Sequence, residues 1–191
     1  MEEKLAGQIV QQADYKTFRP LIKTGDALVW AGNTILQQAI RCWEKPKDST
    51  IGLSHASLVI RPAEYAGWRD RVFMVEATGA QGLHPAILSI ELIKKHGRCF
   101  HISTMLDGGQ REAIEQTALI DACSGIEYDF GGCFYNILGR TIEDAARYFC
   151  SEYVAGKWMQ VGYIPRGTAP IPNELPGIAP KPCVITEIII N

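Results

Sequence analysis

The chain has 191 residues, 47% of them hydrophobic, which is enough for one domain with a sizeable core. Its formal net charge is -2 and no basic stripe runs along it, so we expect no nucleic-acid partner. The apolar runs fall far short of the roughly 20 residues of a spanning helix, which predicts no stable membrane insertion. The start of the sequence lacks the basic-then-apolar pattern of a secretory signal, so we expect a cytoplasmic location.

The spacing of the six cysteines argues against a structural metal. The sequence has no Cys-x-x-Cys pair and no Cys/His cluster at zinc-finger spacing. We therefore expect reduced thiols, no metal and no cofactor. Four cysteines are interpreted as small buried hydrophobic residues: Cys42, Cys99, Cys123 and Cys133.

The N-terminal part of the chain predicts an arm, a strand and a helix. Residues 1–24 are weakly patterned and are expected to form a helix or arm. Residues 25–26 are a turn signal, and the apolar residues 27–30 after them predict a short strand. Asn33 is a candidate cap for a helix whose apolar face includes Leu36, Ile40 and Trp43, with its end at Pro46.

The middle of the chain is rich in strand patterns. Pro85 confines one of the predicted strands to a sheet edge or a bulge. A short helix is expected from its cap at Ser89 to Lys95, with Gly97 closing it. The predicted strands are 54–60, 71–77, 83–88 and 98–103.

The C-terminal half combines two helices with a proline-rich end. Apolar periodicity through Ile114, Ala118 and Ala122 predicts a helix over 109–124. A glycine-rich loop at 125–132 precedes helical patterning over 141–160, with Thr141 as a candidate cap. Residues 163–191 carry six prolines and predict an irregular arm, with one edge strand at 184–190. The predicted layout is α+β, with a central antiparallel sheet flanked by helices.

His55 and Glu76 are candidate partners in acid–base chemistry. Strand alternation places His55, Ser57 and Val59 on one face of their segment. Glu76 lies in an otherwise apolar strand, where a carboxylate is costly unless it is paired. If the two strands are neighbours, Glu76 can orient the imidazole of His55. The alternatives are a structural histidine, and a glutamate that faces water or pairs with Arg71.

Cys150 is the candidate nucleophile. It lies in a stretch of helical character, and a helix N-terminus favours a thiolate. That effect requires the helix to begin at about Phe149, with 141–147 as a separate turn. A helix that begins earlier is the alternative.

The order of these motifs resembles the permuted branch of the NlpC-type superfamily, the YiiX- and YaeF-like proteins. The matching segments are Gly25-Asp26, Ser54-His55-Ala56, Val75-Glu76-Ala77 and Phe149-Cys150-Ser151-Glu152. The resemblance implies a circularly permuted papain-like fold over 25–162 and a Cys150–His55–Glu76 triad without metal or cofactor. It also implies amide or ester hydrolysis through a thioester. Tyr128, with the backbone N–H of Cys150, is a candidate oxyanion donor, and a structural tyrosine is the alternative.

Three functions follow from the resemblance. The first is a cysteine amidase or peptidase acting on a small peptide, amide or peptidoglycan-type substrate. The second is an acyltransferase or lipid esterase that uses the same triad. The third is a catalytically silent binding module. A serine hydrolase is disfavoured because the chain has no Gly-x-Ser-x-Gly elbow.

Overall fold

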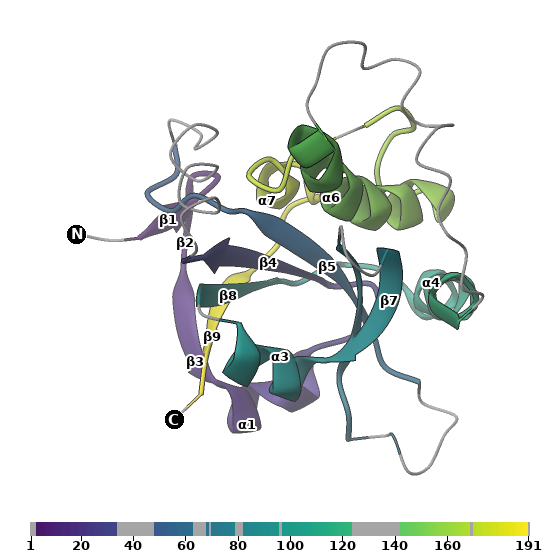
Figure 1. The fold of residues 1–191 in the computed structure, drawn as a ribbon, viewed down its shortest axis with the longest axis horizontal. Helices are drawn as coiled ribbons and strands as arrows, with labels where there is room; N and C mark the ends of the chain where they lie inside the picture. The colour runs from purple at the N-terminus through teal and green to yellow at the C-terminus, as the bar shows by residue number, and fades with distance from the viewer. Residues whose placement is uncertain are drawn as a thin grey trace.

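A computed structural model describes residues 3–33, 48–62, 68, 70–78, 82–95, 97–123, 142–168 and 170–190, with the backbone alone for 142–149. Within these ranges the chain is a mixed α+β structure built on a large, mostly antiparallel sheet (Figure 1). The α+β prediction is thereby confirmed. A separate small hairpin precedes the sheet, formed by β1 (Lys4–Leu5) and β2 (Gln8–Ile9).

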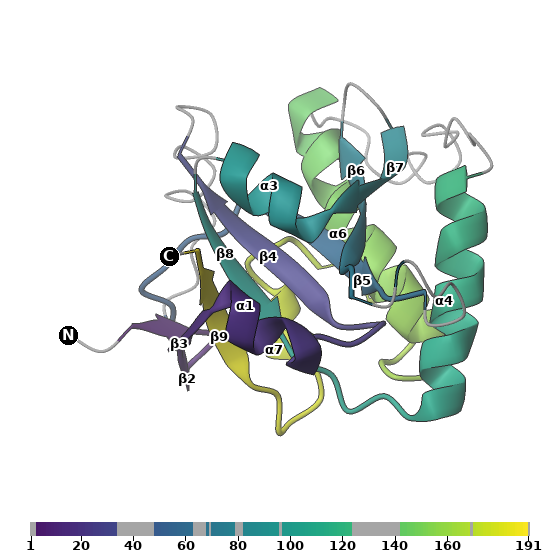
Figure 2. The ribbon, with the colours of Figure 1, turned by 90° about the horizontal axis from the view of Figure 1, so that it is seen from below.

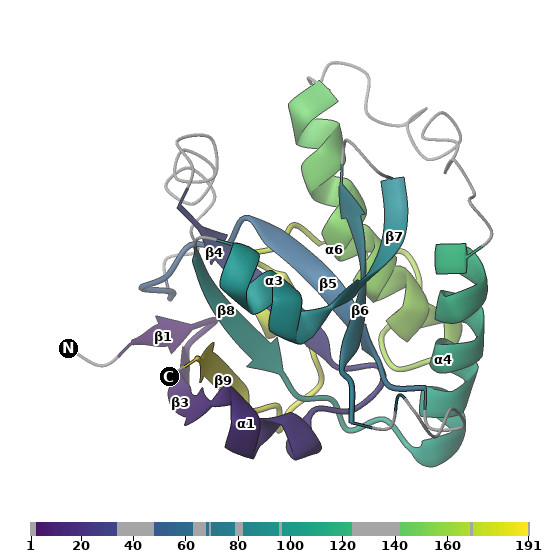
Figure 3. The same cartoon turned by 60° about the horizontal axis from the view of Figure 1, so that its bottom comes forward.

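Seven strands of the described residues form the main sheet. Every neighbouring pair is antiparallel except β3 and β9, which are parallel. The sheet is strongly twisted, so that β6 and β7 stand at a steep angle to β4 and β8 (Figure 3). In spatial order the strands are β3 (Gln11–Asp14), β9 (Ile185–Ile189), β8 (Gly97–Ile102), β4 (Ala27–Gly32), β5 (His55–Ile60), β6 (Phe73–Thr78) and β7 (Gly82–Ile87).

Helices cover both faces of the sheet (Figure 2). The short helices α1 (Tyr15–Phe18) and α3 (Leu88–Lys94) lie on one face, and the 3-10 turn η1 (Arg19–Leu21) directly follows α1. The opposite face packs against three helices: α4 (Gly108–Cys123), α6 (Ile142–Gln160) and α7 (Leu175–Ile178).

Each face of the sheet has its own hydrophobic core. In β5, Ala56, Leu58 and Ile60 are buried against the side of α4 and α6. Val59 belongs to the core on the side of α1 and α3. The predicted alternation along β5 is therefore confirmed, and both faces of this strand are covered.

Most predicted elements are confirmed, with ends displaced by up to two residues. Ile114, Ala118 and Ala122 are buried as the periodicity predicted. The strand with Pro85 lies at the edge of the sheet, where a residue without an N–H costs no ladder hydrogen bond. The expected helix from Asn33 to Trp43, the loop at 125–132 and the cap at Thr141 lie outside the described residues.

Two predicted signals around α3 were wrong. The N-cap residue is Ile87 rather than Ser89, and no side chain caps this helix. Gly97 does not close the helix but opens β8, where it pairs with Gly32. A Cβ at position 97 would lie 2.6 Å from the carbonyl oxygen of Ala31, so this close strand pairing requires a glycine.

The two terminal segments complete the sheet. The first 24 residues were expected to form a helix or arm, and they contribute β3 as well as the short α1. The strand predicted at 184–190 exists, but it is not an edge strand, because β9 lies between β3 and β8. The prolines also permit one helical turn, since Pro176 sits at the start of α7, where its missing N–H is tolerated.

A buried carboxylate joins the start of β4 to the end of β8. Asp26 Oδ2 accepts a hydrogen bond of 2.8 Å from Nε2 of His101, and Oδ1 accepts two from Thr104. Arg111 of α4 lies 3.3 Å from the same carboxylate. The predicted turn before β4 is confirmed, with Gly25 at φ +85°.

Candidate active site

Adjacent strands bring His55 and Glu76 together. β5 and β6 are antiparallel neighbours, with Leu58 opposite Val75. The Nε2 atom of His55 lies 2.8 Å from Oε2 of Glu76. Because an ionised carboxylate only accepts, Nε2 carries the hydrogen of this bond. The predicted pairing of the two side chains is therefore confirmed.

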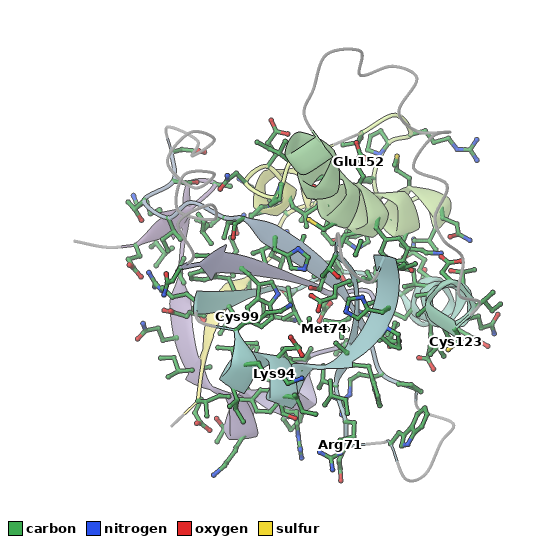
Figure 4. All side chains as sticks on the ribbon, viewed as in Figure 1. Arg71, Met74, Lys94, Cys99, Cys123 and Glu152 are labelled. Atoms are coloured by element: carbon green, nitrogen blue, oxygen red, sulfur yellow. The ribbon has the colours of Figure 1, made fainter. Side chains whose placement is uncertain are left out.

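Glu76 is held by cations and a hydroxyl in a buried position. Its side chain is 3% exposed, so it does not face water. Its Oε2 accepts hydrogen bonds from Lys95 and, at 3.4 Å, from Ser57. Its Oε1 lies 3.5 Å from Nε2 of His84. Arg71, the partner considered from the sequence, is exposed and lies at the foot of the view in Figure 4.

These contacts shift the pKa values of both partners. Burial works to raise the pKa of Glu76, but the hydrogen bond and the charge of His55, together with Lys95, lower it to about 2. Burial likewise works to lower the pKa of His55, but the charge of Cys150 and the hydrogen bonds to Cys150 and Glu76 raise it to about 9. The pair is therefore an imidazolium and a carboxylate at neutral pH.

Cys150 approaches the same imidazole from α6. Its side chain is 2% exposed and packs in the core between the sheet and α6. A side-chain hydrogen bond joins it to His55. The Nε2 atom of the same imidazole faces Glu76. Three side chains from three elements thus form one continuous series.

The helical position of Cys150 differs from the one that a helix N-terminus requires. α6 begins at Ile142, so residues 142–147 belong to the helix rather than to a separate turn, and Cys150 lies more than two turns inside it. The effect of the helix dipole falls off within the first turn. In an α-helix, the backbone N–H of such an interior residue is bonded to the carbonyl four residues earlier, so it is not available as an oxyanion donor. The helical position therefore argues against a donor role for this N–H.

The other sequence predictions about this site have mixed outcomes. Tyr128, Cys42 and Cys133 lie outside the described residues. Cys99 is buried on β8 as expected, whereas Cys123 at the end of α4 is exposed, so its interpretation as a buried residue was wrong (Figure 4). The four described cysteines, which include Cys183, are free thiols.

Three residues of the site were not assigned to it from the sequence: Ser57, His84 and Lys95. Ser57 shares the strand face of His55, and this alternation was a usable signal. His84 stands opposite Glu76 in the β6–β7 pairing, which only the register reveals. Lys95 follows α3, and nothing in its local sequence indicates that it turns toward β6.

The described residues contain no cluster of His, Cys, Asp and Glu suited to a metal ion, and none of their helices has the length and apolarity needed to cross a membrane. A surface cavity of about 690 Å³ lies elsewhere, between α4 and residues such as Lys23 and Arg61. We place the candidate active site at the triad rather than at this cavity, because none of the described residues that line the cavity is a cysteine or a histidine.

Comparison with known proteins adds no family to this description. No protein-family model and no curated protein matches the chain. The functional interpretation therefore depends on the geometry of the site.

Proposed function

We propose that this chain is a cysteine hydrolase that cleaves amide bonds, with Cys150 as nucleophile, His55 as base and Glu76 as the residue that orients the base. One observation carries the proposal, which is the hydrogen-bonded series from Cys150 through His55 to Glu76. A carboxylate on the far nitrogen of the imidazole stabilises the imidazolium and fixes its orientation. A merely structural histidine has no need of a thiol on its other nitrogen.

The reaction runs in two steps. His55 takes the proton of the Cys150 thiol, and the sulfur attacks the carbonyl carbon of the substrate. The tetrahedral intermediate collapses to a thioester as the C–N bond breaks. The leaving amine takes the proton from His55. Water then attacks the thioester and gives a proton to His55. The C–S bond breaks as the product acid leaves, and the sulfur takes the proton back from His55.

The interior position of Cys150 in α6 assigns the stabilisation of the thiolate to His55. The N-terminus of α6 lies more than two turns from Cys150, so in this proposal the stabilising charge comes from the imidazolium of His55. The imidazolium depends in turn on Glu76, which balances its charge in a buried place. We therefore expect each of the two substitutions His55→Ala and Glu76→Gln to suppress the reactivity of Cys150.

The order of the motifs supports a circularly permuted papain-like (NlpC-type) arrangement. The strand with the histidine comes first, the strand with the acid follows, and the cysteine comes late on a helix that packs on the same sheet. The interior position of Cys150 departs from the papain-like pattern. Determining an experimental structure with a thiol-directed inhibitor on Cys150 tests this arrangement.

A small peptide, amide or peptidoglycan-type substrate suits the proposed chemistry. The test offers a panel of amides and esters to the protein, to Cys150→Ala and to Cys123→Ala. The last variant is the control, because it removes an exposed thiol outside the triad. Hydrolysis by the protein and the control, lost by at least about a thousandfold in Cys150→Ala, supports the proposal. Full activity in Cys150→Ala contradicts it.

The same thioester also serves acyl transfer. Incubation with phospholipid is therefore added to the panel to distinguish the alternatives. An acyl mass on Cys150 after incubation with phospholipid supports the lipid alternative. Transfer of that acyl group to an amine identifies an acyltransferase, and its transfer to water identifies a lipid esterase. Tight binding without any adduct or turnover identifies a silent binding module.

A further inference from the structure

The carboxylate of Glu76 is shared between two cationic side chains at a single oxygen. Nε2 of His55 and Nζ of Lys95 both donate to Oε2, and Ser57 approaches the same atom. The bond of His55 to this oxygen therefore exists in competition with an ammonium. A catalytic triad needs only the imidazolium at the carboxylate, so the additional ammonium of Lys95 at Glu76 requires an explanation.

Lys95 is held in place from several sides. Its backbone N–H caps α3 by donating to the carbonyl of Glu91, 2.8 Å away. Its ammonium lies 4.7 Å from the centre of the Trp30 ring and 3.7 Å from the carboxylate of Glu91. Trp30 is itself the strand partner of His55. The side chain is 27% exposed and is fixed over the site rather than free in solvent.

We propose that Lys95 is a positioning residue of the catalytic site, which fixes the carboxylate of Glu76 and limits how tightly His55 holds its proton. This inference rests on the proposed function. In the first step His55 must release a proton to the leaving amine, and a base that binds its proton too tightly is slow to do so. The positive charge of Lys95 opposes the protonation of His55, while Glu76 and Cys150 favour it.

The other titratable groups around the described part of the site remain when Lys95 is replaced. They are Cys150 from α6, His84 from β7 next to Oε1, and Glu91 from α3 next to Lys95 itself. Loss of Lys95 leaves the carboxylate of Glu76 beside His55 without its ammonium, whereas Glu91 keeps its pairing with Lys94. We therefore expect the pKa of His55 to rise in Lys95→Met.

The chain offers a matched control one residue away. Lys94, labelled in Figure 4, ends the same helix, is 67% exposed and pairs with Glu91 at 3.6 Å. Lys94→Met removes the same charge from the same helix and leaves the oxygen of Glu76 untouched. Lys95→Arg is the conservative variant that keeps the charge at the site.

The experiment follows the titration of the His55 ring by NMR in the protein and in these three variants. We expect the midpoint to rise by about one pH unit in Lys95→Met, to stay unchanged in Lys94→Met and to return toward the original value in Lys95→Arg. A Lys95→Met midpoint equal to that of the unmodified protein, in a variant with unchanged backbone spectra, overturns the inference.

A second readout keeps the test decisive if Lys95→Met folds poorly. The pH dependence of kcat/KM on any substrate that the panel finds should shift its alkaline limb upward in Lys95→Gln, with kcat reduced more than KM is raised. Failure of the proposed function looks different. In that case His55 of the unmodified protein titrates near its ordinary pKa, and its midpoint does not respond to Cys150→Ala.

Discussion

At the scale of single residues, the protonation of His55 and Glu76 links the site to the stability of the protein. The pKa of His55 is raised from 6.5 to about 9, so its contribution to stability is complete below pH 6.5 and is lost as the pH rises through about 9. The pKa of Glu76 is lowered from 4.5 to about 2, so its contribution is complete above pH 4.5 and is lost as the pH falls through about 2. We predict that urea denaturation gives the largest free energy of unfolding between these limits, near pH 4.5 to 6.5.

Replacing Glu76 tests the same link directly. Glu76→Gln removes the counter-charge of a buried imidazolium and ammonium, so we expect a loss of about 3–5 kcal/mol at neutral pH. Glu112→Gln, on the exposed face of α4, is the control and should change stability by less than about 0.5 kcal/mol. Equal stability of the two variants in urea denaturation would show that Glu76 carries no buried ion pair.

Asp26 is a second buried carboxylate, with a structural rather than a chemical role. Its oxygens bind His101, Thr104 and Arg111 and hold the ends of β4, β8 and α4 together. We predict that Asp26→Ala costs about 3–5 kcal/mol in thermal or urea unfolding, because several buried donors lose their acceptor. Asp70→Ala on the exposed surface is the control and should change the free energy of unfolding little. An equally small change for Asp26→Ala would refute the structural role of Asp26.

The pairing of His55 with Glu76 was predictable from residues because both lie in consecutive strand patterns, and one is a costly charge in an apolar strand. His84 and Lys95 were not predictable in the same way. Their contacts depend on the register of β6 with β7 and on the path of the chain after α3. Such contacts come from tertiary geometry rather than from local pattern.

At the scale of elements, periodicity located α4 and α6 well but could not decide the role of Cys150 within its helix. The same apolar pattern fits a helix from Ile142 and a shorter one from Phe149. Only the continuous backbone of α6 shows that Cys150 is an interior residue. The prediction that β9 is an edge strand was also wrong. A short apolar strand at the end of a chain has the same sequence pattern at an edge and in the interior of a sheet.

The interior position of β9 has a consequence that substitution can measure. Thr186 lies opposite His101 of β8 and Gln11 of β3, so a proline there removes hydrogen bonding from an interior strand. We predict a loss of about 3 kcal/mol or more for Thr186→Pro in thermal unfolding. Ile190→Pro, just beyond the strand, should cost clearly less. Equal costs would place β9 at an edge.

At the scale of the whole molecule, the two ends of the chain meet in the sheet. β3 pairs with β9, and β9 continues the sheet from β8 (Figure 1). The fold class was predictable from the strand and helix patterns along the sequence. The strand order was not, because it depends on which distant strands pair, and local sequence carries little information about that choice.

This strand order predicts a gradient of protection in hydrogen exchange. β4 lies between β8 and β5 and is buried along its whole length, so its amides should exchange slowest. The amides of the edge strand β7 should exchange faster. Faster exchange in β4 than in β7, measured by NMR or mass spectrometry on the native protein, would contradict the observed strand order.

The central claim, that Cys150, His55 and Glu76 act as one unit, is tested most directly by site-resolved alkylation of the native protein against pH. The exposed Cys123 serves as the internal reference in the same sample. We predict that Cys150 reacts at a lower pH than Cys123 and that His55→Ala abolishes this difference. If Cys150 follows the pH dependence of Cys123 in both proteins, the three side chains form no catalytic unit.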